Sequence, residues 1–142
     1  MREIRGICRF RVRYGETDQM GVTYYANYLD WFTVGRTELL RELGLPYGQL
    51  EREGLLLPVL EARCRYVSPT GYDDPVRLET TLNQLTRTRV AFRYEVFVEG
   101  QPDRLAAEGE TAHAWVDRQF RPVDLKKRFP GVWERLSAVV EG

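Results

Sequence analysis

The chain has 142 residues, of which 43% are hydrophobic and 30% charged, so we expect one globular domain covering residues 1–142. A chain of this length buries a core large enough to need no metal or disulfide. Its 21 Lys and Arg residues balance 21 Asp and Glu residues, which argues against nucleic acid as a partner. No segment approaches the roughly 18 apolar residues of a membrane span, and the N-terminus lacks an apolar signal segment. The expected location is the cytoplasm.

Two cysteines, Cys8 and Cys64, are the sulfur ligands that the chain could offer to a metal. They form no CxxC pair, and the single histidine, His113, is distant in sequence from both. A zinc site needs such ligands at short spacing, so we expect no metal and no cofactor.

The first predicted element is a half-buried strand, because Cys8, Phe10, Val12 and Tyr14 alternate with arginines. A polar loop with a glycine at each end follows at residues 15–21.

A long helix is predicted from Asn27 to Leu43, where apolar residues recur at spacings of three and four. Asn27 is expected to be its N-cap, and Gly44 followed by Pro46 is expected to end it. Gly35 in the middle of the helix costs about 1 kcal/mol against Ala, which a close approach to another backbone would justify.

The rest of the chain is predicted to be mostly sheet, followed by one short helix. Alternating apolar and polar residues predict strands at Leu56–Val67, Val76–Asn83, Val90–Glu99 and Leu105–Val116, and a last helix at Gly131–Val140. The predicted fold class is therefore α+β, with one long helix and an antiparallel sheet of about five strands.

Asp18 is the first candidate for chemistry, because it lies in the loop between the first strand and the start of the long helix. A helix start offers unpaired N–H groups that can stabilise an oxyanion, and a nearby carboxylate can act as nucleophile or general base. Asp in a glycine-flanked loop is, however, also typical of a simple turn.

The residues around Asp18 resemble a family signature. Asp18, Gly21 and Val22 are followed by a tyrosine-rich stretch that ends in Asn27 and Tyr28. This segment is similar to the signature of the 4-hydroxybenzoyl-CoA thioesterase branch of the hotdog superfamily. The resemblance extends over nearly the whole chain, including the stretch 36–38 and the turn at residues 69–74.

The resemblance implies hydrolysis of acyl-CoA thioesters, with coenzyme A as part of the substrate. Asp18 matches the catalytic aspartate, which in some relatives attacks the acyl carbon and in others activates water. The backbone N–H of Tyr25 matches the oxyanion donor, and Gly21 would let the loop approach the thioester. Tyr24, Asn27 and Tyr28 are expected to bind substrate.

The family also implies an assembly and a site for coenzyme A. The long helix is buried in a curled sheet, and protomers pair into a homodimer or homotetramer with active sites between them. Arg87 and Arg89 occupy the turn between the central strands, where relatives contact coenzyme A; the alternative is a solvated hairpin tip. The run Lys126–Arg128 is interpreted as a solvated approach to the last helix rather than a phosphate clamp.

Several residues leave the details open. Many short-chain members carry His where this chain has Tyr25, so the acyl preference stays open. Gln19 and Met20 could shape the acyl pocket or fill the loop. His113 is interpreted as a satisfied sheet residue rather than a base, and Glu16 as a solvated loop charge.

Two other functions remain as alternatives. A hotdog dehydratase would need a His with an acidic partner near the central helix, and this chain has none there. A non-catalytic module that binds acyl-CoA or an acyl carrier is the other alternative, although binding alone does not require Asp18 and Gly21.

Overall fold

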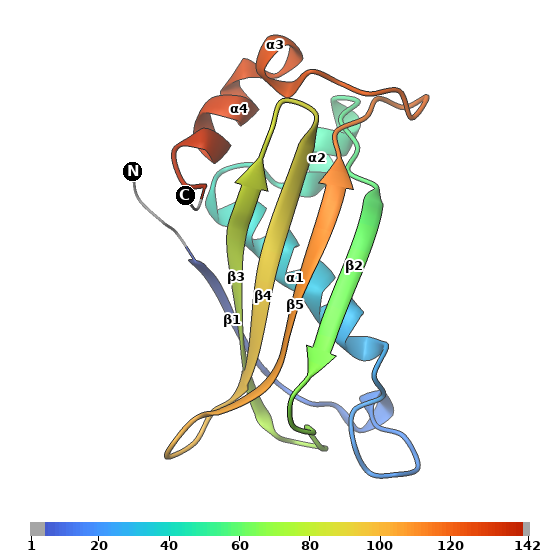
Figure 1. Cartoon of the computed structure of the whole chain (residues 1–142), viewed down its shortest axis with the longest axis vertical. Coiled ribbons are helices and arrows are strands. Elements are labelled where there is room, and N and C mark those ends of the chain that lie inside the picture. The colour runs from blue at the N-terminus through green and yellow to red at the C-terminus, as the bar shows by residue number, and fades with distance from the viewer. Residues whose placement is uncertain (1–4, 141–142) are drawn as a thin grey trace.

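The computed structural model describes residues 5–140 and confirms the predicted order of the five strands, the long helix and the last helix (Figure 1). It adds the short elements η1, α2 and α3, which the sequence pattern does not predict. Residues 1–4, part of the N-terminal segment in which no signal sequence is expected, lie outside the described residues. The elements are β1 (Arg5–Arg11), the 3-10 turn η1 (Tyr14–Glu16), α1 (Asn27–Glu42), α2 (Tyr47–Arg52), β2 (Val59–Tyr66), β3 (Pro75–Leu85), β4 (Arg89–Val98), β5 (Arg104–Ala114), α3 (Leu125–Arg128) and α4 (Pro130–Ser137).

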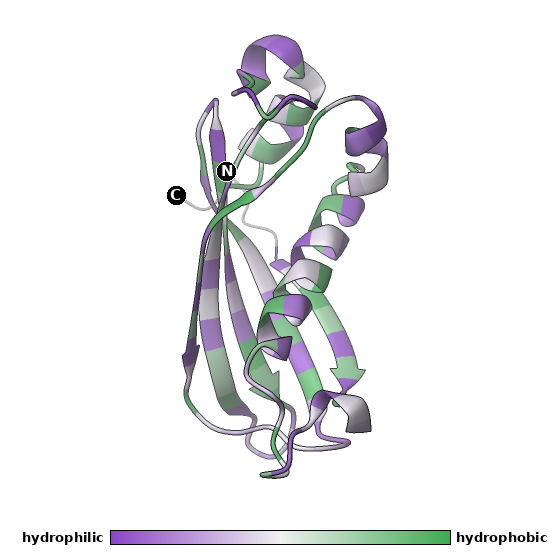
Figure 2. Cartoon of the chain, turned by 90° about the vertical axis from the view of Figure 1, so that its right-hand side faces the viewer, coloured by the Kyte–Doolittle hydropathy of each residue, from purple (hydrophilic) through white to green (hydrophobic). Residues whose placement is uncertain are grey.

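The five strands form one antiparallel sheet in the order β1-β3-β4-β5-β2. Helix α1 lies across one face of this sheet, and the two make separate layers in the side view (Figure 2). Phe32 of α1 stacks on Tyr94 of β4, with ring centroids 4.2 Å apart and planes within 7°. The core thus lies between α1 and the central strands, as the α+β prediction requires.

Gly35 has close neighbours, as its sequence position predicts, but they are side-chain atoms of β3 rather than another backbone. A Cβ atom there would collide with Thr80 Oγ1 and would lie 2.8 Å from Leu78 Cδ2 of strand β3. The missing side chain is therefore what allows the middle of α1 to rest directly on the sheet.

The structure confirms the predicted C-terminal end of α1 but not its predicted N-cap. Gly44 takes a φ of +77°, and the N–H of Leu45 reaches back to the carbonyl of Leu40 at 2.8 Å, which confirms the predicted helix end. The N-cap prediction is wrong, because Ala26 caps the helix and Asn27 is its first residue. Asn27 Nδ2 instead donates to the Glu16 carbonyl at 2.8 Å.

The strand boundaries also shift from their predicted positions. Strand β2 begins at Val59 rather than Leu56, because Leu56 forms only an isolated bridge with Val116. A register irregularity between Val59 and Glu61 follows. Within the described part of the chain, no helix is long and apolar enough to cross a membrane.

Replacing Gly35 with Ala should destabilise the protein although Ala is the better helix former. The propensity gain of about 1 kcal/mol is outweighed by overpacking against β3, which typically costs about 1–3 kcal/mol. Gly48→Ala is the matched control, because a Cβ there would meet only Arg52 Nη1 at 3.6 Å. Urea unfolding should show a loss for the first variant and no loss for the second; equal stabilities would contradict the tight contact.

Candidate active site

The loop that carries Asp18 is a tight turn closed by its own backbone. The Asp18 N–H donates to the Val22 carbonyl at 2.9 Å, and the Gly21 N–H donates to the Asp18 carbonyl at 2.9 Å. Gly21 takes a φ of +83°, a conformation that glycine adopts without steric cost. Asp18 Oδ1 accepts from the Met20 N–H at 2.9 Å, which fixes the orientation of this half-buried carboxylate. For Oδ2, residues 5–140 supply no donor.

Glu16 connects this loop to the start of α1. Its carbonyl accepts from the Tyr24 N–H and from Asn27 Nδ2, both at 2.8 Å. Its carboxylate accepts from the Arg13 N–H at 2.8 Å and from Trp31 Nε1 at 2.9 Å. The interpretation of Glu16 as a solvated charge is therefore wrong: its side chain is only 12% exposed, because a helix residue and the preceding strand end both bond to it.

The same bonds set the charge state of Glu16. Burial alone would raise the pKa of Glu16, but the hydrogen bonds from the Arg13 N–H, Trp31 and the Arg13 guanidinium outweigh it and hold this pKa below its usual value. Glu16 is thus a fixed anion that holds the loop in place.

A cavity of about 300 Å³ opens beside Asp18. One wall comes from the loop and the helix start, and the other comes from the end of β2 and the residues after it. The lining residues are Asp18, Met20, Val22, Thr23, Tyr25, Tyr28, Tyr66, Val67, Ser68 and Pro69. Asp18 and Tyr25 therefore border one cavity, and the Tyr25 N–H has no hydrogen-bond acceptor within residues 5–140.

Tyrosines form the walls of this cavity. The Tyr66 hydroxyl donates to the Tyr25 carbonyl at 2.9 Å, and the Tyr28 and Tyr66 rings lie 5.1 Å apart in an edge-to-face arrangement. The buried Tyr28 hydroxyl shares a hydrogen bond with Thr70 Oγ1 at 3.0 Å. Burial raises the pKa of Tyr28 and that of Tyr66, so both hydroxyls stay neutral near pH 7.

The structure does not bring all predicted site residues to this cavity. Tyr24 is 47% exposed and stands against the ring of Tyr25 rather than in the cavity lining. Asn27 uses its side-chain amide on Glu16, which gives it a positioning role. Gly21 shapes the turn without lining the cavity. Direct substrate contacts by Tyr24 and Asn27 stay predictions.

Arg87 and Arg89 lie at the opposite end of the sheet from the Asp18 loop of the same protomer (Figure 1). Arg87 is engaged in two bonds to Asp124, each 2.9 Å long. Arg89 is exposed and forms no ion pair with any described residue. Within one protomer, neither arginine can take part in the Asp18 site.

His113 is a satisfied sheet residue, as predicted. It is fully buried, with Nε2 2.8 Å from Thr111 Oγ1 and Nδ1 3.3 Å from the Leu57 carbonyl. Burial and, next, the positive charge of Arg36 lower the pKa of His113 to about 4, so the ring is neutral at pH 7.

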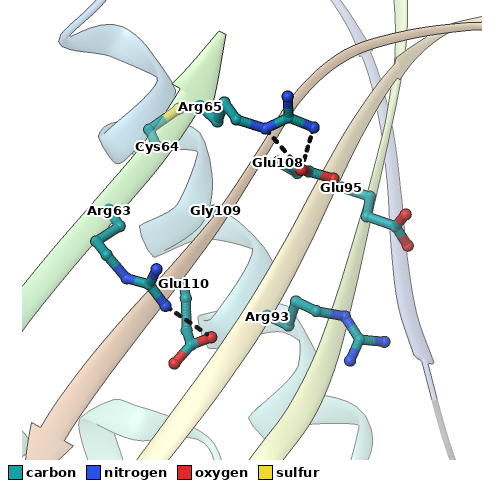
Figure 3. Close-up of a pocket in the computed structure, with 8 residues that line it drawn as sticks. All are labelled: Arg63, Cys64, Arg65, Arg93, Glu95, Glu108, Gly109 and Glu110. Carbon is teal, nitrogen blue, oxygen red and sulfur yellow. Dashed lines mark hydrogen bonds and ion pairs between the residues drawn. The ribbon is translucent and has the colours of Figure 1, made fainter. Parts of the chain in front are cut away.

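A second concavity, of about 670 Å³, is a different kind of surface (Figure 3). It lies on the sheet face opposite α1, where arginines of β2 pair with glutamates of β5. Arg65 Nε donates to Glu108 at 2.9 Å, and Arg63 lies 3.2 Å from Glu110. Because these charges satisfy one another, we assign the chemistry to the smaller cavity beside Asp18.

Comparisons with known proteins bear on this site. A family model described as the thioesterase-like superfamily matches residues 12–136. YneP of Bacillus subtilis (strain 168), provisionally named an acyl-CoA thioesterase, is 35% identical over 120 residues, which are 84% of this chain and 86% of that protein. YbgC of Escherichia coli O157:H7, named an acyl-CoA thioester hydrolase, is 28% identical over 118 residues, 83% of this chain and 84% of that one.

Solved structures agree with the sequence comparisons. The DHNA-CoA thioesterase of Staphylococcus aureus superposes with a TM-score of 0.88 and 32% sequence identity, covering 94% of this chain and 89% of that chain. The family match spans the Asp18 loop, α1 and strands β2 to β5.

Replacing Glu16 with Gln should loosen the Asp18 loop in a pH-dependent way. The native pKa of Glu16 is lowered, so its stabilisation is complete above the usual value of about 4.3 and is lost as the pH falls through the lower native value. We expect Glu16→Gln to cost about 1 kcal/mol at pH 7 and less below pH 4, measured by urea unfolding. Glu38→Gln, in an exposed pair on α1, is the control that should change little. A gap between wild type and Glu16→Gln that is independent of pH would contradict the role of Glu16.

Proposed function

The chain belongs to the thioesterase-like superfamily and is a hotdog-fold acyl-CoA thioesterase, and on this premise we propose that Asp18 and the backbone N–H of Tyr25 act together on the thioester. The observation that carries this assignment is that both residues border one cavity of about 300 Å³. A substrate carbonyl seated there would have a carboxylate on one side and an unpaired amide donor on the other.

The Tyr25 N–H would donate to the carbonyl oxygen. Negative charge grows on this oxygen during attack, and a fixed donor at a helix start stabilises it, an effect worth about 10²–10³-fold in related chemistry. The donor is preorganised, because Tyr66 holds the Tyr25 carbonyl and Glu16 holds the N–H of Tyr24.

Asp18 would supply the nucleophile or the base. As nucleophile, its carboxylate forms a C–O bond to the acyl carbon, the C–S bond breaks, and coenzyme A leaves as a thiolate that takes up a proton. Water then hydrolyses the acyl anhydride. As base, Asp18 takes a proton from the water that attacks the same carbon, the C–S bond breaks, and the proton passes to the departing thiolate of coenzyme A. The Met20 N–H holds one oxygen of Asp18 and leaves the other available in both routes.

The alternatives have less support. A dehydratase would need His chemistry near the helix start, whereas His113, the one histidine of the chain, is buried in β5 with a lowered pKa. A pure binding module would not require the Asp18 carboxylate to border the cavity beside an unpaired N–H.

Strand β2 is the proposed contact with a second copy of the chain. It is an edge strand that pairs only with β5, and it exposes apolar residues at both of its ends. Val59 and Leu60 are each 50% exposed, and Tyr66 is 47% exposed. An unpaired edge presents free N–H and C=O groups that can pair with another strand, and β2 adds apolar side chains at both of its ends.

Antiparallel pairing of two β2 strands about a two-fold axis would also complete the site. Val59 lies at the end of the sheet that carries Arg89, since Val59 pairs with His113 and His113 with Val90. Tyr66, at the other end of β2, borders the Asp18 cavity. Each Asp18 cavity would therefore face Arg89 of the partner, where a cation could meet the coenzyme A phosphates.

Asp18→Asn should abolish thioester hydrolysis while leaving the fold intact. We expect the rate of coenzyme A release from a panel of acyl-CoAs, followed with a thiol-trapping dye, to fall by about 10²–10⁴-fold. Asp30→Asn, an exposed acid in the first turn of α1, is the matched control and should keep wild-type rates. Equal rates for Asp18→Asn and wild type would refute the assignment.

The protein should have at least twice the 16.6 kDa mass of one chain in light scattering at micromolar concentration. Leu60→Lys places a charge on the free edge of β2 and should shift the mass toward the monomer. Ile7→Lys puts the same charge on the other edge strand, where Ile7 is 44% exposed, and should leave the mass unchanged. A monomeric wild type, or identical effects of the two variants, would rule out pairing through β2.

A further inference from the structure

The turn after β5, residues 117–121, presents an exposed aromatic ring in a strained backbone conformation. Phe120 is 65% exposed and has a φ of +61°, in the left-handed region that bulky residues rarely adopt. A phenylalanine gains little from burial here and loses stability to strain, so the fold alone does not account for it. Strain of this kind is typical of sites that bind a ligand.

Asp117 holds this turn rigid. Its N–H donates to the Arg121 carbonyl at 3.0 Å, and its carbonyl accepts from the Phe120 N–H at 2.9 Å. Its Oδ1 accepts from the N–H groups of Gln119 at 2.9 Å and Arg121 at 3.0 Å. The ring is therefore presented to solvent by a preformed loop.

A polar cavity of about 270 Å³ is lined by the residues on both sides of Phe120 in this turn and contains three arginines. Its lining residues are Glu53, Gly54, Asp117, Arg118, Gln119, Arg121 and Arg128. The Nη2 atom of Arg118 donates to the Arg52 carbonyl at 2.7 Å, and this bond fixes the Arg118 side chain. Arg128 is exposed and forms no ion pair within residues 5–140.

The charges in this cavity leave a positive excess. Of the two carboxylates, Asp117 is already engaged by backbone N–H groups and by Arg121 Nε at 3.2 Å. Glu53 is exposed at the rim. Arginines next to a free aromatic face form the combination that binds a phosphorylated purine, since the base stacks on the ring and the guanidinium groups take the phosphate.

We propose that Phe120 and the arginines of this cavity bind the adenosine bisphosphate part of coenzyme A. The inference rests on the proposed function, which makes coenzyme A the leaving group. The adenine stacks on Phe120, and Arg118, Arg121 and Arg128 donate to the phosphates. This role for Arg128 replaces the interpretation of Lys126–Arg128 as a solvated run, because Arg128 lines the cavity. This cavity lies at the Arg89 end of the sheet (Figure 1). The proposed two-fold pairing through β2 would turn it toward the Asp18 end of the partner.

Calorimetry with adenosine 3′,5′-bisphosphate tests the subsite directly. We expect Phe120→Gly and Arg128→Gln each to weaken binding about tenfold, the loss that one stacked base or one phosphate contact brings. Lys127→Gln removes a neighbouring charge outside the cavity and should bind as the wild type does. Adenosine alone and inorganic phosphate alone should each bind more weakly than the bisphosphate, because each offers one half of the ligand.

Thermal unfolding of Phe120→Gly separates binding from structure. Glycine adopts the observed φ without strain, so the melting temperature should stay equal or rise. A lower melting temperature with unchanged nucleotide binding would show a purely structural role and overturn the proposal. If the protein bound the bisphosphate and inorganic phosphate with equal affinity, the cavity would bind anions without recognising the nucleotide. That result would also overturn the proposal.

Kinetics with two thioesters of one acyl group connect the subsite to the reaction. For the acyl-CoA, Phe120→Gly should raise KM about tenfold with kcat unchanged; for the N-acetylcysteamine thioester, which lacks the nucleotide, neither constant should change. Equal changes for both substrates would overturn the subsite. If the wild type hydrolysed neither thioester, the proposed function would fail, and bisphosphate binding would still decide whether the nucleotide site exists.

Discussion

The bonds of Glu16 hold together the part of this protein that carries the proposed active site. Through its carbonyl and its carboxylate, Glu16 bonds to the residues after the first strand, to the Asp18 loop and to the first turns of α1. Its low exposure matters, because a buried anion without these donors would be costly. The position of Asp18 relative to the Tyr25 N–H therefore depends on a residue that takes no direct part in the proposed chemistry.

The two proposed sites of the protomer lie at opposite ends of its sheet. The carboxylate and the tyrosine-walled cavity lie at one end, while Arg89 and the Phe120 turn lie at the other (Figure 1). Strand β2 runs between these ends with an unpaired, partly apolar edge. An antiparallel pair of such strands would join opposite ends of two chains, so assembly and substrate binding would have the same physical origin.

The sequence predicts the five strands and the long helix, because hydrophobic periodicity is a local property, whereas the short helices α2 and α3 are too brief to show such a period. Gly35 was also recognised, since a glycine in a helix interior requires a reason. Asn27 was misplaced because its side chain bonds to a loop rather than to its own helix, and Glu16 was misjudged because exposure depends on the distant Trp31. The role of Tyr66 is not predictable from the sequence, because only the folded sheet brings β2 beside the helix start. A tyrosine in a strand has no sequence feature that marks it as a site residue.

The most direct measurement is the amide proton shift of Tyr25 by NMR during titration with an unreactive acyl-CoA analogue in which CH₂ replaces the thioester sulfur. The account predicts a downfield shift of the Tyr25 N–H as the ketone oxygen accepts its hydrogen bond, together with a perturbed Asp18 carboxyl resonance. Saturating binding that leaves the Tyr25 amide unmoved would contradict it.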